Sequence, residues 1–159
     1  MIEIPHSDLR SLENFSLNWR LTDERWNKLP PESLAQIKPL AAEKCEEIWQ
    51  IQKQYLFPEG LDAKFFEKTE MIRTGAAEDS EINKWLASRI GDEQESIVVL
   101  WDEKTAVKTI SKIFCNYWND FCYPSSDDVS ISPLNLNWLL FYHHDDYFCF
   151  GKSKEEFIR

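Results

Sequence analysis

The sequence predicts a single α+β domain over residues 1–159, with a helical N-terminal half packed on a small, mainly antiparallel sheet formed by the C-terminal half. Three observations predict it. A chain of 159 residues with 43% hydrophobic and 14% aromatic residues is able to bury one core. Apolar residues recur at helical spacing before Glu95, whereas β-branched and alternating runs follow it. Because there are only four glycines and seven prolines, few long flexible loops are expected.

The first helices are expected before residue 57. Thr22 is a candidate N-terminal cap for a short helix that ends before Pro30 and Pro31. Pro39 suits the first turn of a longer helix that runs to about Leu56, because its missing N–H would be unpaired there anyway. Residues that recur at three- and four-residue spacing form one largely apolar face of this helix: Ala41, Cys45, Ile48, Trp49, Gln52, Tyr55 and Leu56.

Two further helices are expected before the sheet. A turn at residues 57–60, marked by its proline and glycine, precedes a short helix over residues 62–72. Ser80 or Asp79 is then expected to cap a clearer helix, which Gly91 ends in the left-handed conformation. The apolar side of this helix consists of Ile82, Trp85, Leu86 and Ile90.

The C-terminal half opens with a β-branched run over residues 95–101, which predicts a strand. Asp102 is expected to cap a helix whose apolar stripe extends from Ala106 to Phe121. Residues 129–132 predict a further strand.

Residues 138–144 and 147–152 predict a β-hairpin around a two-residue turn, Asp145-Asp146. Asp-Asp is a weaker turn pair than Asn-Gly, so a longer loop stays open as an alternative. In this register one face consists of Phe141, His143, Phe148 and Phe150. The other face consists of Trp138, Leu140, Tyr142, His144, Tyr147 and Cys149. Both faces are apolar near the strand centres, so we expect the hairpin to lie in the interior of the sheet.

Residues 113–151 contain no lysine or arginine, yet they hold five carboxylates and half of the aromatic residues of a chain whose net charge is −10. Such a segment is either a dense core with an acidic rim or a surface for a basic partner, and the sequence leaves both open. A pI near 4.8 argues against binding the backbone of a nucleic acid or an anionic membrane, since both need a basic face.

The cytoplasm is the expected location. No apolar run approaches the ~20 residues that cross a bilayer, and the N-terminus lacks the basic start and apolar core of a secretion signal. The cysteines form no Cys-x-x-Cys pair and are expected to be buried, reduced thiols: Cys45, Cys115, Cys122 and Cys149. Their spacing and the three scattered histidines do not suit structural zinc, and no cofactor is expected.

The run His143-His144-Asp145-Asp146 holds four potential metal or acid–base groups. Adjacent strand residues point to opposite faces, so His143 and His144 are not expected to share one metal ion. A metal site would need one of them together with carboxylates from elsewhere. We interpret the run as the solvated tip of the hairpin.

A second candidate is an acidic cluster in which Asp127-Asp128 joins Asp145-Asp146 at one edge of the sheet. Such a cluster suits a divalent ion or the lysines and arginines of a partner, and an ordinary loop of turn-forming residues remains the alternative. The candidate partner-binding residues are Asp127, Asp128, His144, Asp145, Asp146 and Tyr147.

Two blocks of the chain form a recognisable framework. The first block comprises Trp19-Arg20, residues 33–40 and Ile48-Trp49; the second comprises residues 104–107, Phe114, residues 118–121 and residues 148–151. Together they resemble a family of small acidic gammaproteobacterial proteins that share a domain of unknown function. This resemblance implies a fold and no activity. The closing run Trp-x-x-Phe-Tyr-His-His-Asp-Asp-Tyr-Phe-x-Phe-Gly is similar to hairpins of bacterial toxin-immunity proteins, which implies a role in blocking the basic active site of a nuclease toxin.

We therefore expect a non-enzymatic acidic binding protein, an immunity-type inhibitor of a basic protein such as a nuclease toxin. The sequence contains no Gly-x-Ser-x-Gly, no phosphate-binding glycine loop and no His-Glu-x-x-His. Two alternatives stay open: a metal-dependent hydrolase that uses His143 or His144 with nearby aspartates, and a protein that assembles with itself. The identity of the partner and the oligomeric state do not follow from the sequence.

Overall fold

The computed structural model describes residues 1–157 and confirms the α+β class. Seven strands form one sheet in the order β1-β6-β5-β7-β8-β9-β4, and every neighbouring pair is antiparallel. The strands are β1 (Lys38–Pro39), β4 (Phe66–Arg73), β5 (Ser96–Asp102), β6 (Thr105–Ile110), β7 (Val129–Pro133), β8 (Trp138–His143) and β9 (Tyr147–Ser153). The two edge strands, β1 and β4, come from the N-terminal half, so the sheet is larger than the sequence predicts.

The remaining elements surround this sheet. The α-helices are α1 (Trp19–Thr22), α2 (Pro31–Leu34), α3 (Ala42–Gln52), α4 (Asp79–Ile90) and α5 (Ser111–Phe121). A small separate ribbon pairs β2 (Leu56–Phe57) with β3 (Gly60–Leu61). Short 3-10 helices cover His6–Asp8, Leu12–Asn14, Lys53–Tyr55, Ala63–Phe65, Thr74–Ala76 and Glu155–Phe157.

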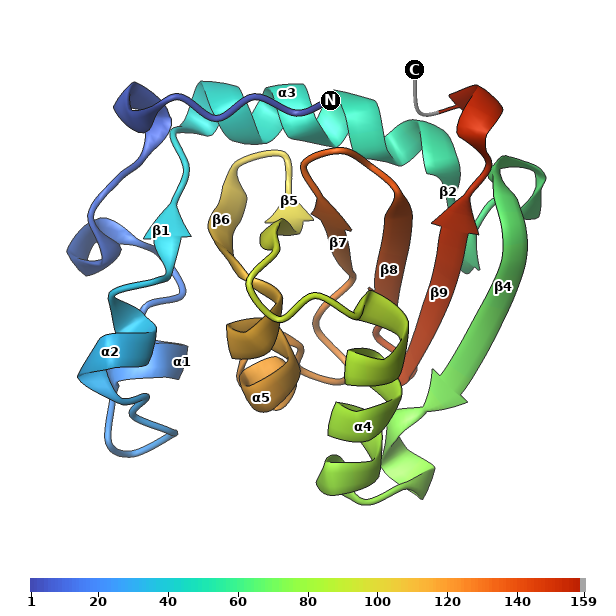
Figure 1. Ribbon diagram of the computed structural model, residues 1–159. Helices are drawn as coiled ribbons and strands as arrows, with labels where there is room; N and C mark the ends of the chain where they lie inside the picture. The colour runs from blue at the N-terminus through green and yellow to red at the C-terminus, as the bar shows by residue number, and fades with distance from the viewer. Residues whose placement is uncertain (158–159) are drawn as a thin grey trace.

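Both faces of the sheet are buried. The larger core lies between the sheet and the helices α4 and α5, and from the sheet it includes Val99, Ile131, Leu140 and Phe148. The smaller core lies between the opposite face and α3, and from the sheet it includes Val98, Leu100, Leu139 and Phe141. Figure 1 shows α3 crossing the top of the view, with α4 and α5 on the lower, nearer side of the strands.

The helices α3 and α4 confirm two predictions and shift their starting points. Gly91 follows α4 with a φ of 83°, the left-handed stop that the sequence indicates. The buried residues of α3 are Cys45, Ile48 and Gln52, which lie on the expected face. However, Pro39 belongs to β1 and α3 begins only at Ala42, because β1 pairs with β6 first. Thr22 ends α1 instead of capping the next helix.

The prediction of a helix over residues 62–72 is wrong. Apart from one short 3-10 turn, this segment is the strand β4, which pairs with β9 from Phe66 to Arg73. A strand here supplies hydrogen-bond partners along the outer edge of β9, which a helix would not. Tertiary pairing therefore overrides the local pattern.

The helix expected to start at Asp102 is also wrong in its first third, because residues 105–110 form β6. The side chain of Asp102 accepts a hydrogen bond from the backbone N–H of Lys104 at 2.8 Å. An aspartate makes this same bond in a tight turn as at a helix N-terminus, and here it closes the hairpin of β5 and β6. The helix α5 begins only at Ser111.

The C-terminal hairpin of β8 and β9 is interior to the sheet, as expected, because β7 covers one side and β4 the other. Its loop is longer than expected. His143 pairs with Tyr147, which leaves residues 144–146 as a three-residue loop. Asp146 has a φ of 70°, the left-handed conformation that closes such loops and that aspartate tolerates better than most residues.

The longer loop shifts the pairing of β9 by one residue. Tyr142 opposes Phe148, and both belong to the core under α5. Phe141 opposes Cys149 on the face toward α3. Because a shift of one residue moves every side chain of a strand to the other face, the expected grouping of Phe148 with Phe141 and His143 is wrong.

Candidate functional site

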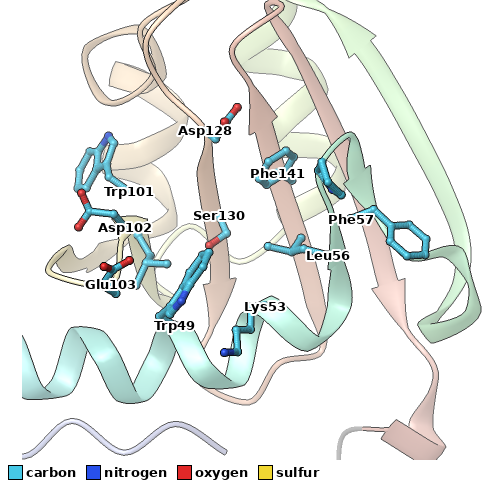
Figure 2. Close-up of a pocket in the computed structure, with 12 residues that line it drawn as sticks. Trp49, Lys53, Leu56, Phe57, Trp101, Asp102, Glu103, Asp128, Ser130 and Phe141 are labelled. Atoms are coloured by element: carbon cyan, nitrogen blue, oxygen red, sulfur yellow. The ribbon is translucent and has the colours of Figure 1, made fainter.

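A pocket of about 400 Å³ lies between the end of α3 and the sheet, on the face opposite α4 and α5 (Figure 2). Its apolar lining includes Trp49, Leu56, Phe57, Leu100 and Phe141. Its charged lining consists of Lys53, Asp102, Glu103 and Asp128. We call this feature the acidic pocket.

The register of the sheet explains the base of the acidic pocket. Leu100 pairs with Ser130, and Ser130 pairs with Phe141, so three neighbouring strands present these residues side by side on one face. Trp49 approaches from α3 and Lys53 from the 3-10 helix that continues it, and their spacing of four residues places both on one side.

The same register explains why carboxylates gather at one end of the acidic pocket. In the antiparallel pair of β5 and β7, Asp102 lies two residues beyond Leu100 and Asp128 lies two residues before its partner Ser130. Both therefore lie at the same end of the two strands, and Glu103 follows in the turn. All three carboxylates are exposed. Among residues 1–157, no lysine or arginine forms a salt bridge with any of them.

A buried polar network lies beneath the base of the pocket. Gln52 is fully buried, and its amide group donates to Ser132 Oγ at 2.8 Å. Ser130 Oγ donates to the carbonyl oxygen of the same amide. Because both ends of the amide are satisfied, Gln52 anchors the last turn of α3 to β7 and holds one wall of the pocket in place.

Next to the pocket mouth lies a cluster of histidines and aspartates. His144 Nδ1 lies 2.9 Å from Asp128 Oδ1, and the backbone N–H of His144 donates to the same oxygen at 3.0 Å. The hydrogen bond between the His144 ring and the Asp128 carboxylate raises the pKa of His144. The rings of His143 and His144 stack with their centroids 4.0 Å apart, and His143 in turn stacks on Tyr147 at 4.8 Å.

The expectation that His143 and His144 point to opposite faces is therefore wrong. Strand β8 ends at His143, so His144 belongs to the loop and is free of the alternation of the strand. Asp128, His143 and His144 each offer one ligand atom within 4.8 Å of the others. The side chain of Asp145 lies nearby, 3.7 Å from His143 Nδ1 and 3.8 Å from His144 Nε2.

Asp127, a sequence-predicted partner residue, is buried. Its carboxylate forms a two-pronged salt bridge with Arg20 at 2.5 and 3.2 Å, and both side chains are 8% exposed. It also accepts the backbone N–H of Tyr123 at 2.9 Å, and the guanidinium of Arg20 lies over the Tyr123 ring. Asp127 thus ties α1 to the loop before β7 and does not contribute to an acidic surface.

Two other predicted partner residues are tied into the structure. Asp146 accepts a hydrogen bond from Tyr142 at 2.8 Å and another from Thr74. Tyr147 donates to the backbone oxygen of Glu59 at 2.5 Å and is half-buried. Of the six candidates, the structure brings together Asp128, His144 and Asp145 as exposed groups.

Sequence reasoning misses the acidic pocket itself. Asp102 is interpreted there as a helix cap, and Glu103 is not considered. The available signal is Trp-Asp-Glu-Lys-Thr between two β-branched runs, which is compatible with a hairpin turn. The contribution of Trp49 from α3 and of Lys53 from the 3-10 helix after it depends on tertiary packing and has no local signal.

The cysteines are free thiols, and three of them are buried as expected, while Cys149 is half-buried. Burial raises the pKa of Cys45 to about 11 and that of Cys115 to about 12, which makes both poor nucleophiles at neutral pH.

No helix among residues 1–157 has the length and apolar character that crossing a membrane requires. Comparison with protein-family models, curated proteins and solved structures found no match to this chain.

Proposed function

We propose that this chain is a non-enzymatic binding protein that takes a lysine or arginine side chain of a basic partner protein into the acidic pocket. The observation that carries this proposal is the lining of the pocket, which includes the carboxylates of Asp102, Glu103 and Asp128. Among the described residues none of the three forms a salt bridge with a lysine or arginine, and Asp128 contacts only the exposed His144. A lysine or arginine of the partner neutralises these carboxylates. In this proposal the chain acts as an immunity-type inhibitor of a basic protein such as a nuclease toxin.

The lining of the pocket suits such a side chain along its length. Lysine and arginine carry an apolar stem and a charged end, and they bury the stem against apolar surface. Trp49, Leu56 and Phe141 offer that surface, and aromatic rings also attract a cation over their faces. The carboxylates at the mouth then face the charged end, and the net charge of −10 favours the approach of a basic protein.

Among residues 1–157, Lys53 is the one lysine or arginine that lines the acidic pocket. Its ammonium group repels an incoming cation, so replacing Lys53 should change the affinity for a cation in the opposite direction from replacing a carboxylate. Removing a carboxylate should weaken the binding of a cation, whereas removing Lys53 should strengthen it. A surface that acts by apolar contact alone would show neither trend.

Calorimetric titration with a nona-arginine peptide tests the proposal. Replacing Asp102, Glu103 and Asp128 together by Asn, Gln and Asn should weaken binding about 10-fold at low salt, since three exposed ion pairs of ~0.5 kcal/mol each sum to one factor of ten. Lys53→Met should strengthen binding about 2-fold by the same reasoning. At ~0.5 M salt, where screening shortens to a few ångströms, the differences should shrink.

The matched control neutralises three exposed carboxylates outside the acidic pocket, through Glu13→Gln, Glu32→Gln and Glu81→Gln. It changes the net charge of the protein by the same amount as the pocket triple variant. Equal weakening by both triple variants would show that the peptide responds to net charge alone, and the pocket would lose its assigned role.

Two further points accompany the proposal. The C-terminal hairpin that resembles toxin-immunity proteins lies beside the pocket mouth, because Asp128 contacts His144 of its loop. The free thiols fit a reducing compartment, and the cytoplasm is the location that we propose.

A further inference from the structure

We infer that Asp128, His143 and His144 form a binding site for a divalent transition-metal ion, with Asp145 as an additional ligand within reach. Their ligand atoms lie within 4.8 Å of one another, although they come from two segments: Asp128 directly precedes β7, whereas His143 ends β8 and His144 begins the loop after it. This inference does not depend on the proposed function.

The distances suit one shared ion. Zinc binds histidine nitrogen and carboxylate oxygen at roughly 2.0–2.2 Å, so two ligands of one ion lie ~3.3 Å apart at tetrahedral angles. Asp128 Oδ1 and His144 Nδ1 are already 2.9 Å apart. Asp145 Oδ2 lies 3.7 Å from His143 Nδ1, which is also close to this spacing, whereas the 3.8 Å contact of Asp145 with His144 involves Nε2, the ring nitrogen that does not contact Asp128.

The site is partly organised and partly adjustable. His143 is 9% exposed and is held by stacking on Tyr147 and by the backbone N–H of Asp145, which donates to its Nδ1 at 3.0 Å. The planes of the two stacked rings are 29° apart, and a ring nitrogen binds a metal ion in the plane of its own ring, so His144 must tilt for both rings to reach one ion. The side chain of His144 is 46% exposed, which leaves it free to do so. A metal ion bound at Nδ1 of His143 displaces the hydrogen bond from the backbone N–H of Asp145, and one bound at Nε2 requires the ring proton to move to Nδ1, which breaks the same hydrogen bond. In either case a metal ion bound at Nδ1 of His144 displaces the His144–Asp128 hydrogen bond.

The donor set selects the class of ion. Two imidazoles with one or two carboxylates suit Zn²⁺, Co²⁺, Ni²⁺ and Cu²⁺, whereas Mg²⁺ and Ca²⁺ prefer sets made of oxygen alone. The site should therefore take Co²⁺ and Zn²⁺ and leave Mg²⁺ in solution.

Titration of chelator-treated protein with CoCl₂ and ZnCl₂ tests the inference, with calorimetry for both ions and visible absorption for Co²⁺. We expect one saturable equivalent and a Co²⁺ spectrum without thiolate charge transfer. His144→Ala and Asp128→Asn should each weaken binding at least about 10-fold. Both residues are exposed, so these variants are expected to fold, which circular dichroism checks.

His6→Ala is the matched control, because His6 is the third histidine of the chain and lies in the first 3-10 helix. It should bind as the unaltered protein does. The absence of saturable binding of Co²⁺ and Zn²⁺ up to 1 mM, or equal binding by His144→Ala and the unaltered protein, would overturn the inference. When the nona-arginine titrations are run in the presence of a metal chelator, either proposal is able to fail without the other.

Discussion

Asp127→Ala is expected to lower the free energy of unfolding by about 3–5 kcal/mol, the range found when one partner of a buried ion pair is removed. The substitution removes the carboxylate that pairs with the guanidinium of Arg20. Because Arg20 is only 6% exposed, its charge is then left buried without a partner. It also leaves the backbone N–H of Tyr123 without its acceptor. Urea denaturation followed by circular dichroism measures the change.

Asp128→Ala is the control one residue further along the chain. Asp128 is exposed and its one ionic partner, among the described residues, is the exposed His144, so the loss should stay within about 1 kcal/mol. The double variant Arg20→Met with Asp127→Asn should lose less than the sum of its single variants, because it removes both charges together. A loss below about 1 kcal/mol for Asp127→Ala would contradict the structural role assigned to this residue.

Phe148→Ala is expected to destabilise the fold by about 3–5 kcal/mol, because truncating a buried phenylalanine loses the transfer energy and leaves a cavity. Phe148 is fully buried, and its ring packs against Phe114, Trp118 and Tyr142 at centroid distances of 6.3, 5.7 and 5.1 Å. Thermal and urea denaturation both measure the loss.

Phe57→Ala makes the same chemical change at a side chain that is 55% exposed, and it should cost less than about 1 kcal/mol. The contrast also tests the register of the hairpin, since a shift of one residue would place Phe148 on the face toward α3, where Cys149 is half-buried. Comparable small losses for Phe148→Ala and Phe57→Ala would contradict the register described above.

The fold was predictable wherever the local pattern and the tertiary context agree. The β-branched run of β5 and the alternating runs of β8 and β9 predict strands, and Gly91 predicts the end of α4. The prediction of a helix over Ala106 to Ile110 was wrong because the apolar spacing of this segment continues smoothly into α5, so a single helix accounts for the pattern of both segments. The strand β4 failed because its reason for being a strand, the open edge of β9, lies some 80 residues away in the sequence.

The candidate site was less predictable, because its groups depend on contacts between distant segments. Asp127 and Asp128 are neighbours in the sequence, yet one is buried against Arg20 and the other lies at the mouth of the acidic pocket. Only the position of Arg20, 107 residues away, separates the two roles. The stacking of His143 on His144 was missed because it depends on a single residue of loop length.

The most direct test of the central claim is a map of amide and indole chemical shifts, measured by NMR while nona-arginine is added to the protein. The acidic pocket predicts that the largest changes fall on the Trp49 indole and on the backbone of Leu100, Glu103, Ser130 and Phe141, which line one cavity. These changes should be absent in the triple variant of Asp102, Glu103 and Asp128. Changes spread over acidic residues on all sides of the molecule, with the pocket residues unaffected, would contradict the claim that this chain binds its partner there.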